Sequence, residues 1–98
     1  MHLDYAVVIP ARYGSRRFPG KPLVDLCGLP MIVRTYRRCL EACPVDRVFV
    51  ATDDERISDV CDSFGIQVVE TSSNCLTGTD RVAEVAQILG IDTVVNVQ

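Results

Sequence analysis

Short apolar runs without polar alternation are the feature that most limits the folds open to this chain. One run covers residues 5–9 and another covers 48–51, and shorter candidates follow at 67–69 and 93–97. Strands of this kind are typical of parallel sheets that are buried on both faces. Between the runs, apolar residues recur at helical spacing. The order β-α-β-α-β-α-β predicts an α/β protein with three α/β/α layers and a mostly parallel, Rossmann-like sheet.

Local signals predict where the helices begin and end. Pro30 stands where a first helical turn tolerates proline, and Pro44 is expected to end that helix. The third helix is expected to carry an apolar stripe from Val82 to Leu89 and to end at Gly90.

The second helix has an acidic start that allows two interpretations. Thr52 and Glu55 have the spacing of a capping box, with Asp53 and Asp54 between them. The acidic residues could be metal ligands, or they could place negative charge at the helix N-terminus. Helix capping is the simpler explanation and is favoured. Gly65 is suited to end this helix.

Size and composition limit the function classes. The 98 residues suit one small domain, and the net charge of −3 argues against a general nucleic-acid binder. No apolar stretch approaches the roughly 20 residues of a membrane span, and the N-terminus does not resemble a signal peptide. The five cysteines are odd in number and include no CxxC pair, so we expect reduced, mostly buried thiols in a cytoplasmic protein.

A basic loop follows the first predicted strand. Four of the ten basic residues stand within residues 12–21, among glycines and prolines. In parallel sheets ligands collect at the carboxyl ends of strands, and a loop with glycine, arginine and lysine suits phosphate groups. The spacing excludes a Walker loop, because five residues separate Gly14 from Gly20 and Pro22 replaces the hydroxyl residue. The dinucleotide motif GxGxxG is also absent.

Four ordered segments carry a specific resemblance. The loop at 10–23 resembles the signature loop of the sugar nucleotidyltransferases, and most closely that of the cytidylyltransferases that form CMP-Kdo (Kdo is 3-deoxy-manno-octulosonate). The segments at 50–55, 77–84 and 95–98 match the same family in order. The resemblance implies a nucleotidyltransferase fold. It also implies transfer of CMP from CTP to Kdo with release of pyrophosphate, in lipopolysaccharide biosynthesis.

The resemblance also assigns roles to individual residues. Arg12 and Lys21 are expected to grip the triphosphate as the catalytic cations. The remaining nucleotide-binding residues are expected to line the phosphate path or to border the cytosine and ribose: Pro10, Ala11, Gly14, Ser15, Gly78 and Thr79. Gln98 is expected near the sugar acid. The competing interpretations are that Thr79 and Asp80 only cap the third helix and that Arg81 only pairs with a carboxylate.

The family also uses Mg²⁺, and its members are commonly homodimers. In the family, a Gly-Asp-Glu-Pro segment follows the position of Gln98, and its aspartate is a magnesium ligand. We therefore expect no metal ligand within residues 1–98 and interpret them as the N-terminal, nucleotide-binding half of a cytidylyltransferase domain, inactive alone. Two alternatives remain open: another 3-deoxy or amino sugar acid as acceptor, and a non-catalytic nucleotide-binding paralogue.

Overall fold

A four-stranded parallel sheet organises the molecule. The computed structural model describes residues 5–14, 20–73, 75 and 77–97. The strands are β1 (Tyr5–Pro10), β4 (Val48–Thr52), β5 (Val68–Glu70) and β6 (Thr93–Asn96). Their order across the sheet is β5-β4-β1-β6, with every pairing parallel. The first strand in the sequence is therefore an inner strand with a neighbour on each side.

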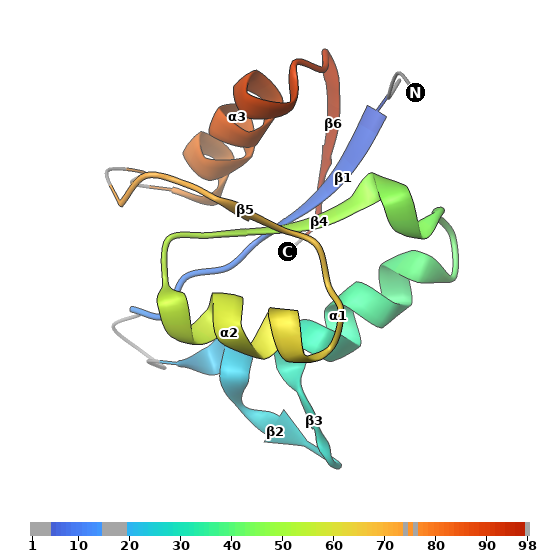
Figure 1. Ribbon diagram of the computed structural model, residues 1–98, viewed down its shortest axis with the longest axis vertical. Helices are drawn as coiled ribbons and strands as arrows, with labels where there is room; N and C mark the ends of the chain where they lie inside the picture. The colour runs from blue at the N-terminus through green and yellow to red at the C-terminus, as the bar shows by residue number, and fades with distance from the viewer. Residues whose placement is uncertain (1–4, 15–19, 74, 76, 98) are drawn as a thin grey trace.

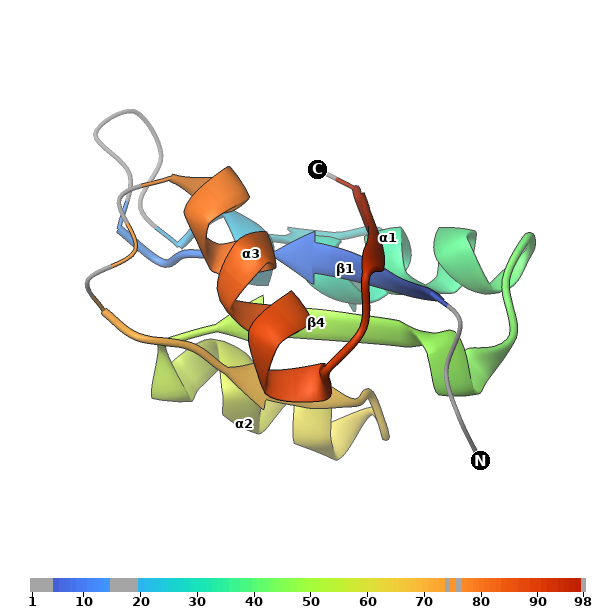
Figure 2. The same cartoon turned by 90° about the horizontal axis from the view of Figure 1, so that it is seen from above.

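Three helices cover the two faces of this sheet: α1 (Met31–Leu40), α2 (Glu55–Ser63) and α3 (Gly78–Leu89). Figure 1 shows α1 and α2 together on one side and α3 on the other, and Figure 2 gives the view at right angles. Alternate side chains of β1 enter the two cores: Val7 and Ile9 pack towards α1 and α2, whereas Ala6 and Val8 pack towards α3. The predicted three-layer α/β fold with a mostly parallel sheet is confirmed.

The predicted helix ends are partly confirmed. Gly65 and Gly90 follow α2 and α3 with φ of 70° and 66°, a left-handed conformation that favours glycine. The first helix ends earlier than expected, because α1 stops at Leu40 and Pro44 instead precedes a short 3-10 helix, η2 (Val45–Arg47). Pro30 lies just before α1 rather than inside its first turn.

The predicted capping box at the start of α2 is wrong. Thr52 is still part of β4, where it pairs with Glu70, and its hydroxyl accepts a hydrogen bond from the Asp54 N–H. The N-cap is Asp54, whose carboxylate accepts from the backbone N–H groups of Arg56 at 2.8 Å and Ile57 at 3.4 Å. Helix capping was the right interpretation for this acidic segment, but a different residue provides the cap.

Two features of the sheet region were not predicted. The segment after the basic loop contains a 3-10 helix, η1 (Lys21–Leu23), and a hairpin of β2 (Asp25–Leu26) and β3 (Leu29–Pro30). Strand β6 pairs only with β1 among the described strands, and Val95 is 46% exposed.

The cap at Asp54 generates a prediction about pH. The pKa of Asp54 is lowered, chiefly by the side-chain hydrogen bond from Arg56. A carboxyl with a lowered folded-state pKa stabilises the fold above its unfolded value of about 3.9, and this contribution disappears as the pH falls through the folded value. We expect Asp54→Ala to lower the free energy of unfolding by about 1 kcal/mol at pH 7, and by progressively less towards pH 3.

Urea unfolding across this pH range checks the prediction. Asp59→Ala is the matched control, because Asp59 is an exposed aspartate in the interior of the same helix. A deficit for Asp54→Ala that stayed constant down to pH 3 would contradict the assignment of the charged cap.

Candidate functional site

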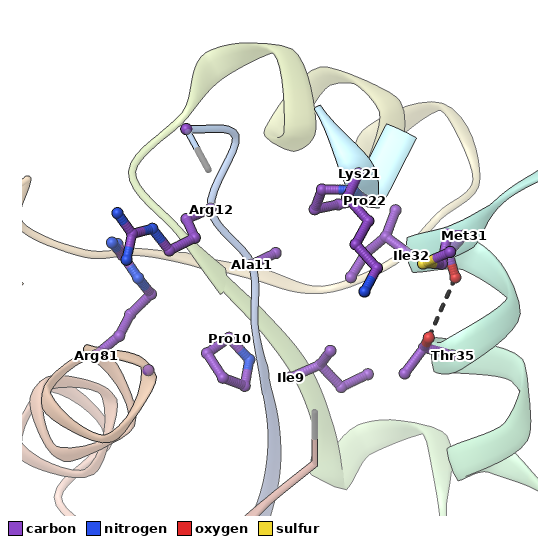
Figure 3. Close-up of a pocket in the computed structure, with 12 residues that line it drawn as sticks. Ile9, Pro10, Ala11, Arg12, Lys21, Pro22, Met31, Ile32, Thr35 and Arg81 are labelled. Atoms are coloured by element: carbon purple, nitrogen blue, oxygen red, sulfur yellow. Dashed lines mark hydrogen bonds between the residues drawn. The ribbon is translucent and has the colours of Figure 1, made fainter. Parts of the chain in front are cut away.

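A pocket opens where β1 ends, between the helices of the two faces. Its volume is about 600 Å³, within the range of ligand sites in proteins. Strand β1 and the residues after it supply Ile9, Pro10, Ala11, Arg12 and Gly14. The other walls come from η1, α1 and the start of α3, with Lys21, Pro22, Met31, Ile32, Thr35, Gly78 and Arg81 (Figure 3).

This position follows from the strand order. The chain moves from β1 to β4 and β5 on one side, and then returns to place β6 on the other side of β1. Such a reversal of strand order leaves a crevice at the carboxyl end of the strand where it occurs, and ligands of open α/β sheets bind there. The basic loop follows that strand, so its charged residues are brought to the crevice.

Backbone hydrogen bonds fix both described ends of the basic loop. The Ala11 N–H donates to the Ala51 carbonyl at 2.8 Å, which extends the pairing of β1 with β4 by one residue. The Gly20 N–H donates to the Tyr13 carbonyl at 2.7 Å. This bond brings the start and the end of the loop together, and Arg12 and Lys21 therefore line the same pocket.

Tyr13 attaches the loop to α2. The Arg56 guanidinium lies 3.3 Å from the centroid of the Tyr13 ring, a cation–π contact. The same guanidinium forms an ion pair of 2.7 Å with the N-cap residue Asp54. This pairing raises the pKa of Arg56. Tyr13 therefore packs on Arg56 at the start of α2, and the N-cap residue Asp54 holds Arg56 in place.

Arg12 and Lys21 enter the pocket from different sides. In Figure 3, Lys21 extends from η1 towards the space between Ile9 and Thr35, whereas Arg12 lies on the side of α3. Both residues are exposed, and neither forms an ion pair or side-chain hydrogen bond within the described part of the chain. Their charges are therefore available to an anionic ligand.

Arg81 is a third cation of the pocket, and it has a different environment. Its side chain is only 4% exposed, and Nη1 donates to the Thr71 hydroxyl. The same Nη1 lies 3.5 Å from Oδ1 of Asp53. The partners follow directly on β5 and β4, so Arg81 joins α3 to the carboxyl ends of two strands. The competing interpretation of Arg81 as a partner of a carboxylate agrees with the Asp53 contact, but Arg81 also lines the pocket.

Glu84 holds the segment that leads to Gly78. Its carboxylate accepts a hydrogen bond from the Ser72 N–H at 2.6 Å and lies 3.7 Å from the Cys75 sulfur. Burial, together with the nearby Glu84 charge, raises the pKa of the Cys75 thiol. The thiol is therefore a hydrogen-bond donor in this segment and not an activated nucleophile.

The remaining cysteines are also free, but fewer are buried than expected. Only Cys61 is fully buried, and Cys27 is exposed in the β2–β3 turn. Burial raises the pKa of Cys61 to about 11, which keeps it neutral at physiological pH.

Most of the predicted site residues meet in this pocket. Six of them line it: Pro10, Ala11, Arg12, Gly14, Lys21 and Gly78. Thr79 is exposed and is not among the lining residues, while Ser15 and Gln98 lie outside the described residues. The cap of α3 is Thr77, whose hydroxyl accepts from the Asp80 N–H at 3.1 Å, so Thr79 does not have the capping role either.

Sequence reasoning missed the α1 wall of the pocket. Met31, Ile32 and Thr35 belong to an ordinary apolar helix stripe, and nothing in their spacing marks them as pocket residues. The signal that was available is their position directly after the loop, since the helix that follows a basic loop returns along the same sheet edge.

The described residues do not by themselves form a magnesium site. Within residues 5–14, 20–73, 75 and 77–97, no three His, Cys, Asp or Glu side chains gather so that they could hold a metal ion. The two aspartates considered at the sequence level have other partners, since Asp53 contacts Arg81 and Asp54 caps α2.

The fold and the pocket define a class of protein: an α/β domain of nucleotidyltransferase fold, with its cleft at the end of the central strand. A family model described as cytidylyltransferase matches residues 6–98. The chain belongs to the cytidylyltransferase family.

Individual relatives agree with this family. The 3-deoxy-manno-octulosonate cytidylyltransferase of Trichlorobacter lovleyi is 52% identical over 96 residues, covering 98% of this chain and 38% of that protein. The 8-amino-3,8-dideoxy-manno-octulosonate cytidylyltransferase of Shewanella frigidimarina is 50% identical over 99 residues, covering 98% of this chain and 40% of that protein. The chain thus spans about two fifths of the length of these curated relatives.

A solved structure is similar over the same range. The structure of CMP:2-keto-3-deoxy-manno-octonic acid synthetase complexed with CTP superposes with a TM-score of 0.91 at 44% sequence identity. The match covers 98% of this chain and 40% of that one.

The turn at Gly20 generates a prediction for the pocket. Gly20 has a φ of 74°, and an added Cβ would lie 3.0 Å from Cε2 of Tyr13. We expect Gly20→Ala to lower the free energy of unfolding by about 1–2 kcal/mol and to weaken binding of a triphosphate, because Lys21 is the next residue. Gly28→Ala is the matched control, since Gly28 also has a positive φ but is not among the pocket residues.

Thermal unfolding and calorimetric titration with CTP measure the two effects. The control variant is expected to lose stability and to keep its affinity. Equal loss of affinity in both variants would contradict a specific role for the Tyr13–Gly20 turn.

Proposed function

We propose that this chain is the nucleotide-binding part of an enzyme that transfers CMP from CTP to Kdo, giving CMP-Kdo and pyrophosphate for lipopolysaccharide biosynthesis. The observation that carries the proposal is the pocket at the end of β1. There Arg12 and Lys21, two cations without an ion-pair partner among the described residues, line the same pocket as Gly14 and Gly78. The relatives named for this activity, and the similar structure complexed with CTP, support it.

The proposed reaction is an exchange at the α-phosphorus of CTP. The anomeric hydroxyl oxygen of the sugar acid attacks this phosphorus and gives up its proton to water. The bond to the bridging oxygen of the β-phosphate breaks, and pyrophosphate leaves with the electron pair. Negative charge shifts towards the leaving group in the transition state. Fixed cations beside that charge lower the barrier, and the side chains of Arg12 and Lys21 are the groups proposed for this role, with Lys21 contacting the transferred phosphoryl group.

The nucleotide is proposed to lie along the loop. The backbone at Gly14 and Ser15 would follow the phosphates, and Pro10, Ala11, Gly78 and Thr79 would border the cytosine and ribose. Gln98 would lie near the sugar acid. Magnesium is proposed as the metal of the complete enzyme, with carboxylate ligands from outside the described residues.

The acceptor is the part of the proposal that these residues determine least. Relatives named for Kdo and for its 8-amino analogue are almost equally similar, at 52% and 50% identity. This similarity suits a region that handles what both reactions share, the CTP. An amino sugar acid is therefore the second candidate acceptor.

A cellular location and an oligomeric state are also part of the proposal. No described helix is long and apolar enough to cross a membrane. The five cysteines are free, which supports a reducing compartment such as the cytoplasm. A homodimer is proposed for the complete enzyme from the family resemblance.

An assay of pyrophosphate release with CTP, magnesium and Kdo tests the function. We expect the 98-residue chain to bind CTP without turnover, and a form extended to the length of the relatives to release pyrophosphate. In the extended form, Lys21→Met is expected to lower kcat/KM by about 100-fold or more, as for a lost transition-state contact, while Arg37→Met on the outer face of α1 leaves it unchanged. Turnover with the 8-amino analogue alone would select the second acceptor, and CTP binding without any turnover in the extended form would select the non-catalytic module.

Gly14 separates a ligand effect from a stability effect. An added Cβ there would meet no heavy atom within 4 Å, and its φ is not in the left-handed region. We therefore expect Gly14→Ala to keep the stability of the protein but to weaken CTP binding by about tenfold, because the methyl group would occupy space beside the phosphates. Calorimetric titration and urea unfolding give the two values, and an unchanged affinity would remove Gly14 from the phosphate path.

A further inference from the structure

Arg56 joins the start of α2 to the loop that follows β1. Its guanidinium lies 3.3 Å from the centroid of the Tyr13 ring. Nε donates to Oδ1 of Asp54 at 3.1 Å, and Nη2 donates to Oδ2 at 2.7 Å. Two parallel contacts with one carboxylate fix the plane of a guanidinium. Arg56 is therefore held in one orientation over the ring of Tyr13, although its side chain is 59% exposed.

Asp54 fixes this arrangement to the core of the molecule. Its Oδ1 also accepts from the backbone N–H groups of Arg56 and Ile57, so the carboxylate is bound to the first turn of α2. The Asp54 backbone N–H donates to the hydroxyl of Thr52 at 3.1 Å, and Thr52 is fully buried in β4. The end of β4 and the start of α2 thus set the position of the Arg56 guanidinium.

Tyr13 lies between the two segments that carry the exposed cations of the pocket. It follows Arg12 directly, and its carbonyl accepts the hydrogen bond from Gly20, the residue before Lys21. Its ring is also close to Gly20, because a Cβ added there would lie 3.0 Å from Cε2. A shift of Tyr13 would therefore displace Arg12 and the turn that leads to Lys21 together.

Arg56 is not itself a wall of the pocket. Its positive charge is compensated by the Asp54 carboxylate 2.7 Å away, which weakens its attraction for an anion at a distance. An exposed ion pair also contributes little to the stability of a fold. The contact with the Tyr13 ring is the part of this arrangement that reaches the pocket.

On the basis of the proposed function, we propose that Arg56 is a positioning residue of the phosphate-binding loop. Through Tyr13, it holds Arg12 and Lys21 in the places from which both contact the triphosphate of CTP. Groups that are already in place lose less conformational freedom when the ligand binds, and this strengthens binding. Arg56 therefore raises the affinity for the phosphates and does not act on the base.

Calorimetric titration of the 98-residue chain with CTP and with inorganic tripolyphosphate tests this role. We expect Arg56→Met to weaken both ligands by about fivefold, the size of one exposed cation–π contact, and to leave the urea midpoint of unfolding unchanged. Arg56→Lys keeps a cation beside the ring, and its affinities are expected to stay within about twofold of wild type. Arg37→Met removes the same charge from an exposed residue outside this pocket, and it is expected to change neither affinity.

A double-mutant cycle shows whether Arg56 acts through Tyr13. Tyr13→Leu is expected to weaken both ligands by about fivefold, because the ring is lost. Adding Arg56→Met to this variant is expected to cause no further loss, since the effects of residues that act through one contact are not additive. Tyr13→Phe keeps the ring and is expected to bind as wild type.

The possible failures separate this role from the proposed function. Unchanged affinities in Arg56→Met, an equal loss in Arg37→Met, or additive losses in the double variant would overturn the role of Arg56 and leave the proposed function in place. Failure of the wild-type chain to bind either CTP or tripolyphosphate would overturn the proposed function together with it.

Discussion

The pairing of β1 on both of its edges is the constraint on which the site depends. β1 bonds β4 through Val7 to Pro10 and bonds β6 through Tyr5 to Val8. A strand held on two sides ends at a fixed point, and the chain after it can only leave into the crevice between the helices of the two faces. The positions of Arg12 and Gly14 relative to α3 follow from this geometry, and the hydrogen bond from Gly20 to Tyr13 then brings Lys21 to the same crevice.

The element order was predictable because the inner strands are buried on both faces and therefore consist of apolar residues without polar alternation. Residues 48–52 are all buried, and residues 48–51 form an uninterrupted apolar run that Thr52 follows. The β2–β3 hairpin was missed because its turn uses Cys27 with a φ of 54°, a conformation that cysteine rarely adopts.

The site was predictable where the residues are neighbours in sequence and unpredictable where the fold joins distant segments. The charge and glycine content of the run from Pro10 to Lys21 predict that it binds phosphate groups. The contact of Arg81 with Asp53 joins residues 28 positions apart and exists only because α3 packs beside the ends of β4 and β5. A helix stripe shows which residues face the core, but it does not show that an arginine at its start turns inwards. The predicted capping box of α2 was wrong for the same reason, since the pairing of Thr52 with Glu70 keeps Thr52 in the sheet.

The cations of the pocket differ in their exposure and in their partners. Arg12 and Lys21 are exposed to water. Removing water from such groups on binding is unfavourable, and a strongly charged partner offsets this cost. Arg81 has lost most of its water on folding, and its Nη1 contacts Asp53 and Thr71. The pocket at the end of β1 therefore combines two exposed cations with one buried cation that already has a carboxylate beside it.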